Sequence, residues 1–82
     1  MEKDLIRVQK KIEKTYKKVE QLLKDKQFDL VDDIEIQFKK ELTRESNQIS
    51  KKYKVEDKRI ISNILFGVAL IKREEIYFKA VK

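Results

Sequence analysis

The chain has 82 residues, of which 44% are charged and 40% hydrophobic, and its formal net charge is +6. It contains no Cys, His or Pro and a single Gly. Without Cys and His, the Ser-His-Asp and Cys-His nucleophile arrangements, zinc fingers, haem sites and iron–sulfur sites are excluded. One Gly also excludes Gly-rich phosphate loops, which need two or three. We therefore expect one helical domain over residues 1–82 that acts by binding. No enzyme activity, metal, cofactor or small-molecule substrate is evident.

The N-terminal residues are charged rather than apolar, so no secretory signal is visible. The longest apolar stretch, residues 60–71, contains Ser62 and Asn63 and is bounded by basic residues on both sides. A transmembrane helix needs about 20 consecutive apolar residues, so this stretch predicts a buried helix and no membrane span. Because the absence of Cys also fits a reducing compartment, we expect a cytoplasmic protein.

The first predicted element is a helix over about residues 3–25. Its apolar residues recur at steps of three and four and fall within about one third of the helical wheel. They are Leu5, Val8, Ile12, Tyr16, Val19, Leu22 and Leu23. A basic row lies opposite this apolar stripe. It comprises Lys3, Arg7, Lys10, Lys11, Lys14, Lys17 and Lys18.

The second predicted helix spans about residues 30–54, and its apolar residues also share one face of the wheel. They are Phe28, Val31, Phe38, Leu42, Ile49 and Tyr53. Asp29 is the expected N-cap, because a short acidic side chain satisfies the free N–H groups at a helix start. Lysines at the far end of the helix, residues 51–54, suit the negative end of the helix dipole.

The third predicted helix spans about residues 57–80, with Asp57 as the expected N-cap. From residue 60 to residue 71 it is apolar nearly all round, which is typical of a helix buried on several sides. Two partner helices do not cover such a helix, so we expect an apolar strip to remain exposed. Gly67 costs about 1 kcal/mol relative to Ala inside a helix. It indicates either the close approach of another helix or a tolerant position.

A second interpretation of residues 33–38 remains open. Three apolar residues alternate with polar ones there, which is a period-two pattern that fits a short strand. With helices at about 40–54 and 58–73, the arrangement resembles the ribbon-helix-helix DNA-binding family, in which a dimer lays a two-stranded ribbon in the major groove. That resemblance implies Glu35, Gln37 and Lys39 as the positions that read bases. The chain lacks the Gly or Ser that this family often carries at the turn.

Charge is divided unevenly along the chain. Residues 1–27 carry nine Lys and Arg and five Asp and Glu, which gives a net charge of +4. Residues 28–57 carry six basic and eight acidic residues, a net charge of −2. Residues 58–82 carry six basic and two acidic residues, a net charge of +4. If the helices are antiparallel neighbours, the turn after the second helix returns to the start of the first. One basic surface would result. The candidate nucleic-acid contacts on it are Lys3, Arg7, Lys10, Lys14, Lys17, Lys18, Lys51, Lys52, Lys54, Lys58 and Arg59.

The main hypothesis is a compact all-α bundle of three helices that dimerises and acts as a protein-interaction module. An inhibitor, immunity protein or accessory factor is the expected type. Its binding surface would be the apolar face of the third helix, because exposed apolar patches mark interfaces. The candidate residues are Leu70, Ile76, Tyr77 and Phe78. The alternative is a basic protein that binds DNA or RNA through the lysine-rich surface described above. The opposing interpretation of that surface is a solvated helix face.

Overall fold

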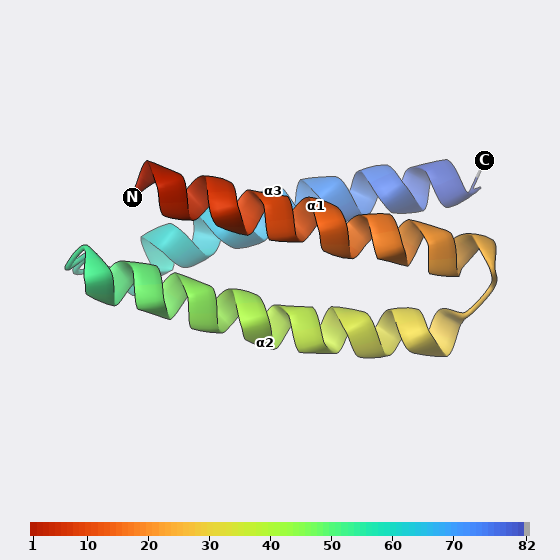
Figure 1. The fold of residues 1–82 in the computed structure, drawn as a ribbon, viewed down its shortest axis with the longest axis horizontal. Helices are drawn as coiled ribbons and strands as arrows, with labels where there is room; N and C mark the ends of the chain where they lie inside the picture. Colours follow the sequence, from red (N-terminus) through yellow and green to blue (C-terminus); the bar gives the residue numbers. More distant parts are fainter. Residues whose placement is uncertain (82) are drawn as a thin grey trace.

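A computed structural model describes residues 1–81 as three helices. They are α1 (Glu2–Lys24), α2 (Phe28–Lys52) and α3 (Lys58–Val81). The helices run up, down and up, and each packs against the other two in a body of 42 × 20 × 18 Å (Figure 1). This confirms the all-α prediction, and the observed helix bounds lie within two residues of the expected ones. Over the described residues no helix is long and apolar enough to cross a membrane.

The ribbon interpretation of residues 33–38 is wrong, because this segment lies in the middle of α2. Within it Phe38 is buried, Ile34 is half-buried one turn earlier, and Ile36 is 53% exposed. Ile34 and Phe38, four residues apart, therefore lie on the face of α2 that packs against the core, whereas Ile36 lies on the exposed face. No Pro or Gly interrupts residues 28–52, so nothing in the chain stops the helix there.

The turn between α1 and α2 uses backbone bonds instead of a side-chain cap. Lys26 adopts a positive φ of 58°, and the N–H of Gln27 donates to the carbonyl of Leu22 at 2.9 Å. This closes the end of α1 as a glycine often does in other helices. Because α2 begins at Phe28 with Gln27 as its N-cap, the expectation that Asp29 caps it is wrong. Asp29 lies in the first turn, where its negative charge faces the positive end of the helix dipole.

The turn between α2 and α3 is built in a similar way. Lys54 has a φ of 55°, and the N–H of Val55 donates to the carbonyl of Ser50 at 2.9 Å. The predicted role of Asp57 is confirmed. Its Oδ1 accepts the backbone N–H of Arg59 at 3.0 Å and so satisfies one free donor at the start of α3.

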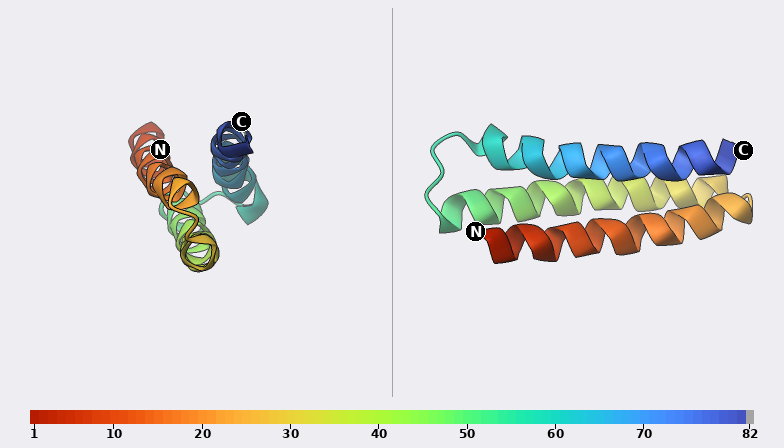
Figure 2. Two further views of the ribbon diagram at one scale, coloured as in Figure 1. Left: turned by 90° about the vertical axis from the view of Figure 1, so that its right-hand side faces the viewer. Right: turned by 90° about the horizontal axis from the view of Figure 1, so that it is seen from above.

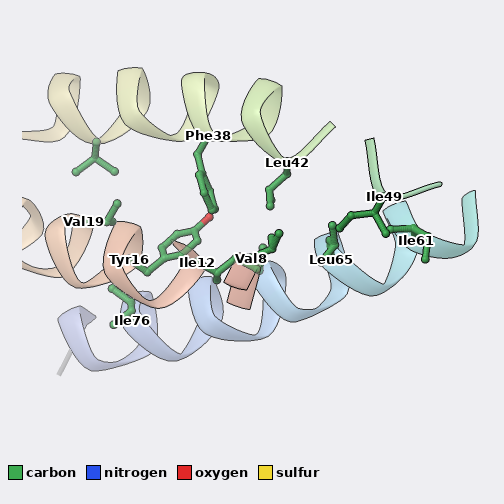
Figure 3. Packing of buried hydrophobic residues seen from close by; sticks show 12 residues of the cluster. Val8, Ile12, Tyr16, Val19, Phe38, Leu42, Ile49, Ile61, Leu65 and Ile76 are labelled. Carbon is green, nitrogen blue, oxygen red and sulfur yellow. The ribbon is translucent and has the colours of Figure 1, made fainter. Parts of the chain in front are cut away.

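The core runs along the axis between the three helices (Figure 3), and over the described residues each helix supplies four buried hydrophobic residues to it. They are Val8, Ile12, Tyr16 and Val19 from α1; Val31, Phe38, Leu42 and Ile49 from α2; and Ile61, Leu65, Ala69 and Ile76 from α3. The rings of Tyr16 and Phe38 meet edge to face, with centroids 6.0 Å apart. Two residues of the predicted apolar stripe lie outside the core, because they stand at the two ends of α2. Phe28 is 58% exposed and Tyr53 is 36% exposed.

Candidate functional site

One line of residues on α3 points away from the other two helices. Its members recur at steps of four and three, which keeps them on a single face of the helix. This outer row consists of Ile60, Ile64, Gly67, Ile71, Glu74 and Phe78. The exposed fractions are 52% for Ile60, 45% for Ile64, 69% for Ile71 and 66% for Phe78, and the adjacent Leu70 is 52% exposed.

The outer row is exposed because α1 and α2 lie together on the opposite side of α3. The end-on view in Figure 2 shows this arrangement. The inward side of α3 supplies its four core residues, and Ile60 and Ile61 show the contrast at adjacent positions, with exposed fractions of 52% and 2%. The expectation of an apolar strip that two partner helices cannot cover is confirmed.

The structure divides the four predicted partner-binding residues between surface and interior. Leu70 and Phe78 are exposed, but Ile76 is only 2% exposed and packs in the core. Tyr77 is half-buried, and its hydroxyl donates a hydrogen bond to Glu35. Ile76 and Tyr77 are therefore packing residues. Ile60, Ile64 and Ile71 share the exposed face but were not among the predicted residues. Their spacing was visible in the sequence, but spacing alone does not show which face of α3 the other helices cover.

A polar cluster fixes the C-terminal half of α3 to α2. Arg73 Nε donates to Glu35 Oε2 at 2.9 Å, and its guanidinium lies 4.5 Å from the centre of the Tyr77 ring. Glu35 thus bonds to both residues and is not available at an outer surface. Burial of the phenol and its hydrogen bond to Glu35 raise the pKa of Tyr77 to about 12. Ionised Tyr77 would face the Glu35 carboxylate at close range.

The raised pKa of Tyr77 predicts an alkaline limit to stability. Because the pKa of Tyr77 in the folded state lies above the ordinary value of about 10, the folded state favours the protonated phenol. The contribution of this phenol to the free energy of unfolding is therefore complete below pH 10 and is lost as the pH rises towards about 12. The measurement is urea unfolding of the wild type and of Tyr77→Phe between pH 8 and 11.5. The difference between the two proteins should shrink as the pH rises, and a constant difference would contradict the assignment.

Gly67 stands in the middle of the outer row, and no helix of the bundle approaches it. A Cβ built at this position meets nothing within 4 Å. The close approach of another helix to Gly67 therefore does not occur within the described bundle. The interpretation of a tolerant position remains, at a cost of about 1 kcal/mol of helix stability relative to Ala.

Two members of the basic row on α1 are held by acidic residues of α2. Arg7 Nη2 lies 2.7 Å from Glu45 Oε2, and Lys11 Nζ lies 3.5 Å from Glu45 Oε1 and 3.3 Å from Glu41 Oε1. Burial alone would raise the pKa of Glu45, but the bond to Arg7 and the charge of Lys11 outweigh it and lower that pKa. These two cations stabilise the α1–α2 contact.

The expected return of the second turn to the start of α1 is confirmed. Lys52 Nζ lies 3.3 Å from Asp4 Oδ2, and the hydroxyl of Tyr53 also bonds to Asp4. Asp4 therefore offsets part of the positive charge at this end, and Arg59 is paired with Asp57 at 3.1 Å. The remaining predicted nucleic-acid contacts are exposed and form no ion pair with another residue of the described chain. They are Lys3, Lys10, Lys14, Lys17, Lys18, Lys51, Lys54 and Lys58.

In the part of the chain that the structure describes, no three acidic, His or Cys side chains gather in a way that would hold a metal ion. Comparison of the chain with protein-family models, with curated proteins and with solved structures gives no match. The geometry of the outer row and the distribution of charge therefore carry the functional argument.

Proposed function

We propose that this chain is a non-enzymatic protein-interaction module that binds another protein surface through the outer face of α3. The observation that carries the proposal is the exposed apolar row on that helix. In a chain with 44% charged residues, positions 60–71 hold no charge at all, and Ile60, Ile64, Leu70 and Ile71 each remain about half exposed or more. Contiguous exposed apolar surface of this kind marks interaction sites.

Covering this face would contribute favourable free energy to binding. Full burial of an Ile, Leu or Phe side chain is worth about 1.5–3 kcal/mol. These side chains have kept roughly half of their surface in water, so covering several of them contributes several kcal/mol. The α3 backbone that carries them is held by its core residues and by the Arg73–Glu35 bond. The face is thus presented on a rigid element.

Site-specific photo-crosslinking in the cells that produce the protein tests this proposal. A photoreactive amino acid replaces either Ile71 in the outer row or Ile36, which is 53% exposed on α2 and serves as the matched control. We expect a discrete protein adduct from position 71 and none from position 36. Binding of the identified partner, once purified, should be lost in Ile71→Asp and kept in Ile36→Asp. Equal adducts from both positions would contradict the proposal.

A second candidate function, nucleic-acid binding, is supported by the exposed lysines of α1. Lys10, Lys14 and Lys17 follow one another along one side of the helix and are exposed. Lysines contact phosphates as point charges and read bases poorly, so such binding would be insensitive to sequence.

The test of this second function is a gel-shift titration with random-sequence DNA and RNA at low and moderate salt. If α1 binds phosphates, the affinity falls steeply with salt, and the combined Lys10→Glu, Lys14→Glu and Lys17→Glu variant loses it. The Ile71→Asp variant is the matched control and should bind normally. Binding that survives the three charge reversals would exclude this surface.

A further inference from the structure

We propose that the partner of the outer row is the same row of a second copy of this chain, packed antiparallel in a two-fold dimer. The inference rests on the proposed function, because it names what covers that face. A surface that binds its own copy must be self-complementary under a two-fold rotation. The outer row meets this condition in its spacing, in its residue sizes and in its charge.

The spacing of the row reads the same in both directions. Steps of four, three, four, three and four residues allow two antiparallel copies to interdigitate along the whole length of the row. In the register that uses every member, Ile60 lies opposite Phe78 of the second copy, and Gly67 lies opposite Ile71 of the second copy. Leu70, beside the row, then meets Leu70 of the second copy close to the two-fold axis.

Residue sizes favour this register. Gly67 leaves open space at the surface of α3, and Ile71, one turn away, is the most exposed apolar side chain of the row at 69%. In the antiparallel pair the small residue of one helix faces the large residue of the other, twice. Alternation of large and small residues across facing positions lets two helices interdigitate without voids. Within one chain Gly67 is a tolerant position, whereas between two chains it makes room for Ile71 of the second copy.

Charge also distinguishes the antiparallel pair from a parallel one. Glu74 is the only charged member of the row. A parallel pair would place Glu74 against Glu74 and Gly67 against Gly67, which combines like-charge repulsion with a gap. The antiparallel pair separates the two carboxylates and places each opposite Ile64 of the second copy, between the central and the outermost apolar contacts. At the ends of the row Arg59 is already paired with Asp57, and Lys79 with Glu75.

The area is large enough for a stable dimer. With exposed fractions of 45–69%, the five apolar side chains of this face present on the order of 600 Å² per chain. Two facing copies would then cover on the order of 1,200 Å², which is the lower end of the roughly 1,200–2,000 Å² found in stable specific interfaces.

Gly67→Glu tests the dimer without disturbing the fold. The new side chain meets no atom of its own chain within 4 Å at Cβ, and Glu is a better helix former than Gly. In the dimer its carboxylate would be buried against Ile71 of the second copy. By sedimentation velocity we expect the wild type to approach twice the 9.9 kDa chain mass, and Gly67→Glu to remain at the chain mass. The dissociation constant should rise at least about 100-fold. Ile36→Glu is the control and should stay dimeric.

A distance measurement tests the orientation. A nitroxide on Arg59→Cys labels an exposed position near the start of α3, where the arginine is paired with its neighbour Asp57. In the proposed register the two labels are separated by 20 residues of helix, which is about 30 Å along the axis. In a parallel pair they lie within about 20 Å. The shorter distance would overturn the antiparallel dimer.

The outcomes separate this inference from the proposed function. A wild-type chain that stays monomeric at high concentration, but gives an adduct with a different protein from position 71, overturns the dimer and supports the proposed function. A monomer that gives no adduct overturns both. A dimer that Gly67→Glu leaves intact overturns the outer row as its interface.

Discussion

Phe38→Ala is expected to lower the free energy of unfolding by about 3–5 kcal/mol, because it opens a cavity at the centre of the bundle. Phe38 is only 4% exposed, and its ring packs edge to face on the buried ring of Tyr16, with centroids 6.0 Å apart. The measurement is thermal and urea unfolding followed by circular dichroism. For a domain of this size each kcal/mol shifts the melting temperature by about 4–8 °C, so a loss of more than about 12 °C is expected.

Phe28→Ala is the matched control for this prediction. It removes the same atoms from the same helix, but Phe28 is 58% exposed at the first position of α2. We expect a loss below about 1 kcal/mol, since most of that ring is already in water. Similar losses in the two variants would contradict the contrast between the buried Phe38 and the exposed Phe28.

The contrast between these two phenylalanines shows what a helical wheel leaves out. Both residues share one phase of α2, so periodicity assigns both to the core. Burial also depends on the position along the axis, since a side chain is covered only where a neighbouring helix extends beside it. Phe28 stands next to a turn, whereas Phe38 stands beside the middle of α1. The angular position of each phenylalanine on the helix could be predicted from the sequence. Whether a neighbouring helix covers that position along the axis could not.

The candidate surface could be anticipated only in part for a related reason. The sequence indicated that α3 carries more apolar surface than two helices cover, and this is confirmed. It did not indicate which side stays outside, because a helix that is apolar all round has little phase of its own. The positions of α1 and α2 decide that side. They place Ile76 inside and leave Ile71 outside, although periodicity alone allows either.

Part of the basic row on α1 is paired with α2, which a helical wheel cannot show because it represents one helix at a time. Arg7 and Lys11 lie among the lysines of α1 but point towards α2, where Glu41 and Glu45 receive them. The two basic residues are four positions apart on α1, and the two acidic residues are four positions apart on α2. The basic residues of one helix therefore lie opposite the acidic residues of the other. That matched spacing was visible in the sequence and predicts an α1–α2 contact once the helices are known to be neighbours.

Ile61→Asp is expected to abolish folding, whereas Ile60→Asp is expected to leave the bundle intact. Ile61 is 2% exposed, and an aspartate there would be buried without a partner, which costs more than about 4 kcal/mol. That loss approaches the whole stability of a small domain, which is about 5–15 kcal/mol. Far-ultraviolet circular dichroism should show a largely unfolded chain. A cooperative unfolding transition close to that of the wild type would contradict the buried position of Ile61.

Ile60→Asp makes the same chemical change one residue earlier, at a side chain that is 52% exposed. Ile60 also lies in the first turn of α3, where a negative charge stabilises a helix, so at low protein concentration the free energy of unfolding should change by less than about 1 kcal/mol. At high concentration the variant should lose the dimer, because the carboxylate would face Phe78 of the second copy. The Ile61 variant thus reports on the fold and the Ile60 variant on the interface. Together they separate loss of structure from loss of binding.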